Sequence, residues 1–170
     1  MLGRPHKDEY STIYEGSIGK VPDGNVLEML ERNITKTVSL LRSIGEDKAA
    51  YRYAPGKWSI KQVVGHLSDS ERVFSYRALR FARGDTTPLP GYEENLYADI
   101  GNSDIQALEA LAHEFHAIRQ STMALFRSFD DDTWLRKGTA SDVDFTVRAL
   151  AYQIAGHEIH HVGILQERYL

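Results

Sequence analysis

Apolar residues recur with the period of an α-helix in four long stretches of this chain. A hydrophobic residue at every third or fourth position marks a helix with one buried face. The four stretches are residues 26–44, 59–82, 103–129 and 146–170. None of the five prolines lies inside them, and no segment shows the alternation of a strand. The pattern predicts an all-α protein built as a four-helix bundle.

Residues that favour helix ends lie at several of these boundaries. Ser59–Gln62 and Ser103–Gln106 both have the spacing of a capping box, which satisfies free backbone N–H groups at a helix start. Asp23 precedes the first helix, Gly45 follows it, and Thr146 is placed to cap the fourth helix. We therefore expect the third helix to begin at Ser103.

The connections differ in length and character. Residues 1–22 mix tyrosine, glycine and serine, which predicts an irregular N-terminal arm. Residues 84–102 predict a long loop between the second and third helices, with a short helix near 93–100, and this loop is long enough to cross the bundle. Residues 130–142 are polar and predict a shorter loop. The length of 170 residues predicts a single domain spanning 1–170.

Composition restricts the chemistry. The chain has no cysteine, which excludes disulfides, iron–sulfur clusters, thiolate zinc sites and a cysteine nucleophile. A metal site must therefore use histidine, aspartate or glutamate. Lys+Arg number 20 against 24 Asp+Glu, a balance that argues against a nucleic-acid partner. No stretch approaches the ~20 apolar residues of a membrane span, and the first residues lack a signal sequence. We expect a cytoplasmic protein without a membrane partner.

Three of the seven histidines predict a metal site. His157 and His161 stand four residues apart on the inward face of the fourth helix, a spacing found in metal sites. His66 lies on the flank of the inward face of the second helix. For the pair alone, two stacked core histidines are the simpler alternative, and for His66 alone it is a partly buried, hydrogen-bonded histidine. Together the three favour a shared divalent ion.

The other histidines are weaker candidates. His113 and His116 lie off the apolar stripe of the third helix, His160 points to the side of the fourth helix, and His6 belongs to the N-terminal arm.

Two further motifs overlap the histidine pair but fit poorly. Residues 157–161 match the H-E-x-x-H pattern of metalloproteases, yet little chain remains to supply a third ligand. Glu158 and His161 match half of a di-iron signature whose second half we do not find. Glu158 is therefore either a residue that orients a ligating imidazole or a surface residue, and Asp69 is a second candidate for the orienting role. No side chain is singled out as catalytic.

Contacts with a substrate are expected from the long loop and the N-terminal arm. For each candidate taken alone, a structural role is the simpler explanation. For Tyr76 and Arg77 that role would be helix packing and an ion pair. The candidates are Tyr10, Tyr14, Arg52, Tyr92, Tyr76 and Arg77.

Two segments resemble the signatures of a known family. Residues Pro55–Leu67, with the sequence PGKWSIKQVVGHL, resemble the first signature of the DinB/YfiT-like superfamily. Residues Gly156–His161, with the sequence GHEIHH, are similar to its second signature. The resemblance extends over nearly the whole chain and includes the order of the helices. It implies a four-helix bundle in which His66, His157 and His161 hold a divalent metal ion.

The same resemblance implies several possible activities. Characterised members include thiol S-transferases and a thiol-dependent isomerase, many others are called metal-dependent hydrolases, and homodimers are frequent. We therefore expect a metalloenzyme of S-transferase or hydrolase type that acts on a small molecule. A low-molecular-weight thiol is one substrate that this resemblance implies. Imidazole ligands favour zinc or nickel. The alternative is a non-catalytic bundle that binds a metal or ligand and acts as a dimeric interaction module.

Overall fold

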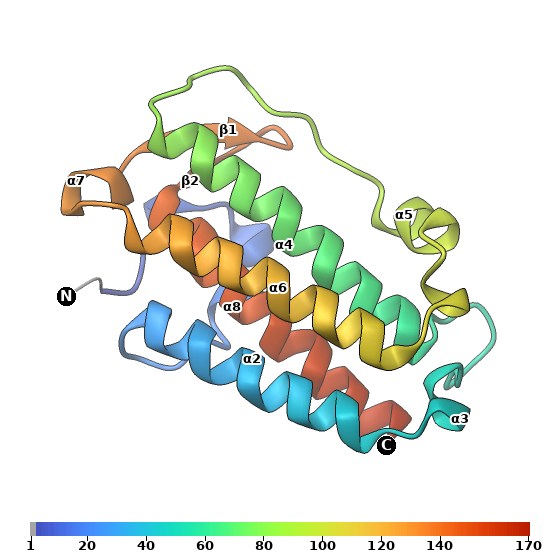
Figure 1. The fold of residues 1–170 in the computed structure, drawn as a ribbon. Coiled ribbons are helices and arrows are strands. Elements are labelled where there is room, and N and C mark those ends of the chain that lie inside the picture. Colours follow the sequence, from blue (N-terminus) through green and yellow to red (C-terminus); the bar gives the residue numbers. More distant parts are fainter. Residues whose placement is uncertain (1–2) are drawn as a thin grey trace.

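The computed structural model describes residues 3–170 and shows four long helices packed side by side (Figure 1). Each of α4 and α2 packs against both α6 and α8, so that α2 lies diagonally opposite α4. The all-α bundle predicted from the sequence is confirmed. The four helices are α2 (Val26–Ser43), α4 (Ile60–Ala82), α6 (Leu108–Arg127) and α8 (Val147–Ile164).

The four long helices do not simply alternate in direction along the chain. Helices α4 and α6 are neighbours that run in the same direction, so the chain between them returns along the length of the bundle (Figure 1). This returning segment contains the short helix α5 (Glu94–Ile100), close to the predicted 93–100. The long loop thus joins adjacent parallel helices and lies over one side of α4, where it contributes to a cavity described below.

The predicted capping box at the start of α4 is present. The Ser59 hydroxyl accepts a hydrogen bond from the Gln62 backbone N–H at 3.0 Å, and the Gln62 side chain accepts one from the Ser59 N–H at 3.1 Å. The Thr146 hydroxyl caps α8 by accepting from the Ala149 N–H at 3.1 Å.

In α2 the cap is Asn25 rather than Asp23. Gly45 does follow α2, but it also begins the short helix α3 (Glu46–Ala49).

The predicted start of the third helix at Ser103 is wrong. Ser103–Ile105 form a single 3₁₀ turn, Gln106 is extended, and α6 begins only at Leu108. The Ser103 side chain packs closely against Gly65 of α4 instead of capping a helix. Glu46 takes over the cap from a distant part of the chain, since its carboxylate accepts from the Leu108 N–H at 3.0 Å. A tertiary contact therefore overrides the local signal.

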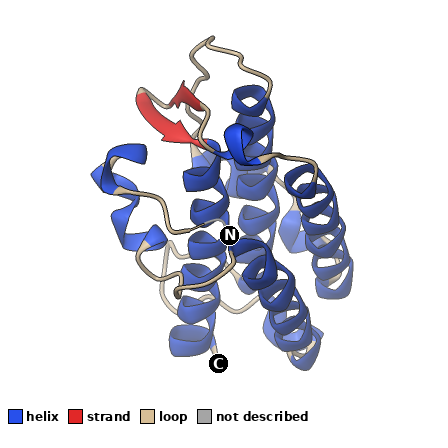
Figure 2. Ribbon diagram, turned by 90° about the vertical axis from the view of Figure 1, so that its left-hand side faces the viewer, coloured by secondary structure: helices blue, strands red, loops and turns tan. Residues whose placement is uncertain are grey.

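The sequence also missed a β-hairpin, shown in red in Figure 2. Strand β1 (Lys137–Ala140) lies in the stretch 130–142 expected to be a loop, and it pairs antiparallel with β2 (Val143–Thr146), which follows that stretch. The two turn residues, Ser141 and Asp142, both have positive φ, at 53° and 61°. Such a turn usually contains glycine, which explains the weak sequence signal. The 130–142 stretch also contains the short helix α7 (Asp131–Trp134).

The N-terminal arm is more ordered than predicted. It contains two 3₁₀ turns (Lys7–Glu9 and Thr12–Tyr14) and the short helix α1 (Glu15–Ile18), which packs on α8. Beyond α8, the chain ends in one π-helical turn, Leu165–Tyr169. No helix within residues 3–170 is both long and apolar enough to cross a membrane.

The contact between α1 and α8 depends on a glycine. A Cβ atom at Gly156 would lie 2.0 Å from the backbone oxygen of Ser17, which cannot move without displacing α1. We expect Gly156→Ala to lower the free energy of unfolding by about 1–3 kcal/mol, as for other overpacked sites. Gly163→Ala is the control on the same helix, because nothing lies within 4 Å of its added Cβ. Urea unfolding of both variants tests this, and equal effects would contradict it.

Candidate metal centre

Three imidazoles from two helices converge inside the bundle. His66 on α4 and His157 and His161 on α8 each place one ring nitrogen within 4.8 Å of the other two. The Nε2 atoms of His66 and His157 are 3.0 Å apart. Ligand nitrogens of one tetrahedral zinc ion lie about 3.4 Å from one another, given Zn–N bonds near 2.0–2.1 Å. The three histidines therefore have the donor type and the spacing that a divalent ion requires.

Burial keeps these histidines neutral. Only 4% of the His66 surface is exposed, and this burial lowers its pKa to about 4. Burial, together with the neighbouring rings of His66 and His160, lowers the pKa of His161 to about 3, and that of His157 falls well below its usual value for the same kind of reason. Neutral imidazoles retain the lone pair that binds a metal ion.

The surroundings of His66 hold its ring in place. The Trp58 ring packs against it, with ring centroids 4.7 Å apart. The Ser70 hydroxyl lies 3.4 Å from the His66 Nδ1 atom and 2.8 Å from the Tyr92 hydroxyl. This chain of polar contacts leaves the Nε2 atom directed at His157. Sequence reasoning missed Ser70, although it stands one helical turn after His66 on the same face.

A carboxylate that the sequence did not single out also approaches the cluster. The Glu94 Oε2 atom lies 4.0 Å from the His66 Nε2 atom, and 56% of the Glu94 side chain is exposed. Its position at the start of α5 depends on the path of the long loop, for which the sequence holds no local signal.

The two carboxylates proposed to orient the imidazoles have other partners. Glu158 is buried rather than at the surface, where it accepts a hydrogen bond from the Thr37 hydroxyl at 2.7 Å and lies 2.9 Å from the Arg119 guanidinium. Asp69 is partly exposed and faces Arg72 at 3.6 Å. Within residues 3–170, neither carboxylate forms a hydrogen bond with the three clustered histidines.

The remaining histidines lie outside the cluster. His6, His113, His116 and His160 are all exposed. The ring of His160 touches that of His161, with centroids 5.0 Å apart, but does not belong to the group of converging nitrogens.

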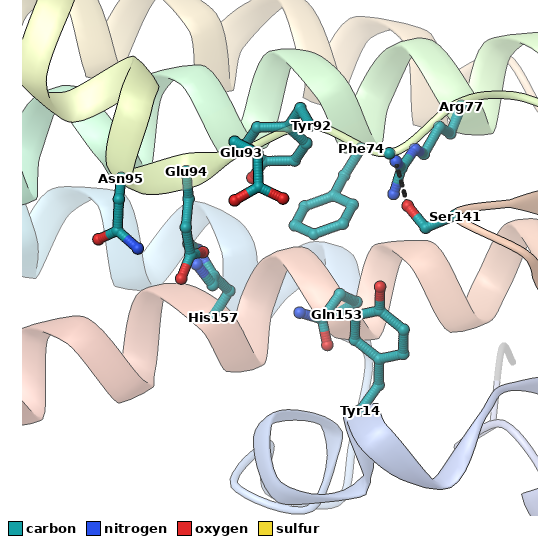
Figure 3. A pocket seen from close by; sticks show the side chains of 11 residues that line it. Tyr14, Phe74, Arg77, Tyr92, Glu93, Glu94, Asn95, Ser141, Gln153 and His157 are labelled. Carbon is teal, nitrogen blue, oxygen red and sulfur yellow. Dashed lines mark hydrogen bonds between the residues drawn. The ribbon is translucent and has the colours of Figure 1, made fainter.

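A cavity of about 580 Å³ opens onto the cluster at His157 (Figure 3). Three of the residues expected to contact a substrate line it, namely Tyr14, Arg77 and Tyr92. Its volume lies within the range of roughly 300–1,000 Å³ that is usual for ligand sites. A smaller cavity of about 200 Å³, bordered by aromatic rings that include Trp58, opens onto His161.

The other expected contact residues do not line the large cavity. Tyr76 is half exposed and hydrogen-bonds Arg80. Arg52 hydrogen-bonds Gln62 and Asp104 near the start of α4. Tyr10 packs on the hydrophobic core.

Comparison with known proteins identifies the family. The model of the DinB superfamily matches residues 29–165, which is most of the chain. The protein belongs to the DinB superfamily. The resemblance noted in the sequence is therefore confirmed.

Individual relatives of this DinB-superfamily protein are distant. YfiT of Bacillus subtilis is 25% identical over 157 residues, covering 89% of this chain and 86% of that protein. A relative from Oceanobacillus iheyensis is 21% identical over 139 residues, covering 81% and 79%. Both are named "putative metal-dependent hydrolase". The solved structure of YfiT has a TM-score of 0.72 at 19% identity, covering 96% of this chain and 89% of its own, and is described as having an unusual four-helix bundle topology.

The buried histidines predict acid sensitivity of the metal-free protein. The His66 pKa falls from 6.5 when unfolded to about 4 when folded, so the unfolded chain binds more protons between these values. Stability is therefore retained above pH 6.5 and lost as the pH falls toward 4. At pH 5 the loss from His66 alone is about 2 kcal/mol. Urea unfolding at pH 7 and pH 5 measures it, and His66→Gln should show a smaller difference between the two values.

Proposed function

We propose that this protein is a divalent-metal-dependent enzyme that acts on a small molecule, as a hydrolase or a thiol S-transferase. His66, His157 and His161 are the proposed ligands, and zinc or nickel is the proposed ion. The observation that supports this most is the convergence of three neutral imidazoles at the end of a 580 Å³ cavity. The names of the two relatives point the same way.

In this proposal the histidine ligands and the side chains around them have separate roles. Three protein ligands leave a coordination position free for a reactant, as in catalytic rather than structural sites. A bound ion supplies Lewis acidity, which lowers the pKa of water or a thiol. Glu94 is the carboxylate placed to accept the proton that such a nucleophile loses, because it lies beside His66 and remains open to the cavity. Ser70 and Tyr92 hold the His66 ring, and Trp58 excludes water from its face.

Two cavities meet the histidine cluster, and this arrangement favours transfer to a thiol over hydrolysis. Hydrolysis needs room for one organic substrate, whereas transfer to a thiol needs room for two. The large cavity reaches His157 and the smaller aromatic one reaches His161, and Asn95 borders both. Two organic reactants can therefore approach the cluster from two sides. A low-molecular-weight thiol as one of them and a homodimeric state are further parts of the proposal that come from the family resemblance. A cytoplasmic location is a further part that comes from the expectation stated for the sequence.

The test begins with the metal. Elemental analysis of the purified protein should find about one zinc or nickel ion per chain. The metal-loaded protein should then be assayed with ester and amide substrates, and separately with small thiols together with electrophiles, against the metal-free protein. Turnover in the first assay supports a hydrolase and thiol-dependent turnover in the second supports a transferase. A bound metal without either activity would favour the non-catalytic binding module, and a protein that binds no metal would refute the proposal.

A further inference from the structure

The large cavity contains a buried arginine, Arg77, that pairs with no carboxylate of the described residues 3–170. Arg77 of α4 is only 2% exposed and lines the cavity at the end away from His157 (Figure 3). Its Nη2 atom donates to the Pro90 carbonyl at 3.0 Å and to the Ser141 hydroxyl at 2.8 Å. No carboxylate in the described part of the chain, residues 3–170, lies within 4 Å of the Arg77 guanidinium. The side-chain hydroxyls that adjoin it, those of Tyr14, Tyr92 and Ser141, are uncharged at neutral pH.

The second fully buried arginine shows what is missing at Arg77. Arg119 of α6 is 0% exposed, and its guanidinium contacts the carboxylates of both Glu71 and Glu158. A buried guanidinium costs several kcal/mol unless an anion compensates its charge. Within the described part of the chain, carboxylates supply that anion to Arg119, whereas none pairs with Arg77.

The hydrogen bonds of Arg77 leave donors free for a ligand. A guanidinium has five N–H donors, and both bonds named above use the Nη2 atom. The Tyr14 and Tyr92 hydroxyls border the same cavity and stabilise the positive charge, and Tyr14 also engages one guanidinium N–H, which leaves two of the five donors. Arginine remains charged at neutral pH even when burial lowers its pKa, as it does here. Its free edge therefore matches the geometry of a carboxylate or phosphate group.

The cavity is also polarised along its length. The Phe74 ring lies between the two ends, with its centroid 5.7 Å from the Arg77 Cζ atom and 6.0 Å from the His157 ring centroid. Glu93 and Glu94 line the end near the histidines, opposite Arg77 (Figure 3). In the metal-free protein an anionic group is repelled at that end and attracted at the other, which favours one orientation of a small molecule. A bound divalent ion would offset the two carboxylates and leave the attraction at Arg77 unchanged.

We propose that Arg77 binds an anionic group of the substrate, a carboxylate, phosphate or sulfonate, and so directs the uncharged part of that molecule past Phe74 toward the three histidines. The inference rests on the proposed function for the identity of the reacting end. It adds a positioning residue and a substrate class: small molecules that carry an oxyanion at one end.

Binding of simple probes tests this without turnover. Calorimetric titrations with phenylphosphonate, benzoate and the neutral control benzamide should show binding of the two anions and not of benzamide. Arg77→Gln should weaken anion binding by about 10–100-fold, the usual effect of losing a charged hydrogen bond. Arg72→Gln is the matched control on the same helix, because Arg72 is half exposed and does not line this cavity. It should change the affinity less than twofold.

Two precautions keep the result interpretable. Circular dichroism checks folding, and Arg77→Lys serves if Arg77→Gln unfolds, since lysine keeps the charge but loses the two-pronged geometry and should still weaken binding. Each titration uses both metal-free and metal-loaded protein. Equal anion affinity in wild type and both Arg77 variants, or binding only through the metal, would overturn the proposal while leaving the metal site intact. Arg77-dependent binding by a protein that takes up no metal would support this subsite and refute the proposed metalloenzyme.

Discussion

Replacing Arg119 by methionine should lower the free energy of unfolding by about 3–5 kcal/mol, the usual cost of removing one partner from a buried ion pair. The Arg119 guanidinium binds both carboxylate oxygens of Glu71 at 2.8 Å, lies 2.9 Å from Glu158, and donates to the Leu30 carbonyl. Glu71 and Glu158 are 3% and 2% exposed, so methionine leaves two carboxylates buried without a cation.

The control for this prediction lies on the same helix. Arg127 of α6 pairs with Glu31 at 3.1 Å, but both side chains are more than half exposed. Arg127→Met should therefore cost less than about 1 kcal/mol. Urea unfolding of both variants at pH 7 makes the comparison. Adding Glu71→Gln and Glu158→Gln to Arg119→Met should recover part of the loss, because neutral amides need no cation. Similar small effects of the two arginine substitutions would show that the buried cluster is not a source of stability.

The second large expected effect is the loss of metal binding when His157 is replaced by alanine. The His157 Nε2 atom lies 3.0 Å from that of His66, and the imidazole faces the cavity. Loss of a residue that merely supports a ligand costs 10–100-fold in metal affinity, and loss of a ligand should cost more. His160→Ala is the matched control, since His160 is exposed on the same helix and outside the cluster.

Two measurements test whether His157→Ala loses metal binding. Elemental analysis after dialysis should find metal in wild type and His160→Ala but not in His157→Ala. Zinc or nickel at about 100 times its dissociation constant should stabilise the first two proteins by about 2.7 kcal/mol and leave the third unchanged. A His157→Ala protein that retains its metal and this stabilisation would exclude His157 from the ligand set.

Local sequence signals succeeded where a single element contains all that they require. The capping box Ser59–Gln62 forms because both side chains and both N–H groups belong to one helical turn. The same pattern failed at Ser103–Gln106, since Ser103 packs against Gly65 and Glu46 caps the helix from another part of the chain. The hairpin turn at Ser141 and Asp142 escaped detection because its residues are unusual for positive φ.

The candidate site shows the same division. Histidines four residues apart share a helical face by geometry alone, so the pairing of His157 with His161 follows from spacing. Their convergence with His66 was expected from the inward side of its helix, and the structure places the rings together. Their role as metal ligands stays a prediction. Glu94 and the oxyanion-binding role proposed for Arg77 depend on the loop path and on which buried charges find partners, which no local pattern encodes.

The sequence by itself determined the helical class, the extent of most of the four long helices, and the restriction of any metal ligand to histidine and carboxylate side chains. These follow from periodicity, capping and composition, which act over one or two helical turns or over the whole chain at once. The tertiary structure alone decided that α4 and α6 run parallel, that Glu158 pairs with Arg119, and that no carboxylate among residues 3–170 pairs with Arg77. The reason is physical: which buried charges meet is decided by the packing of segments far apart in the chain, and adjacent residues do not encode it.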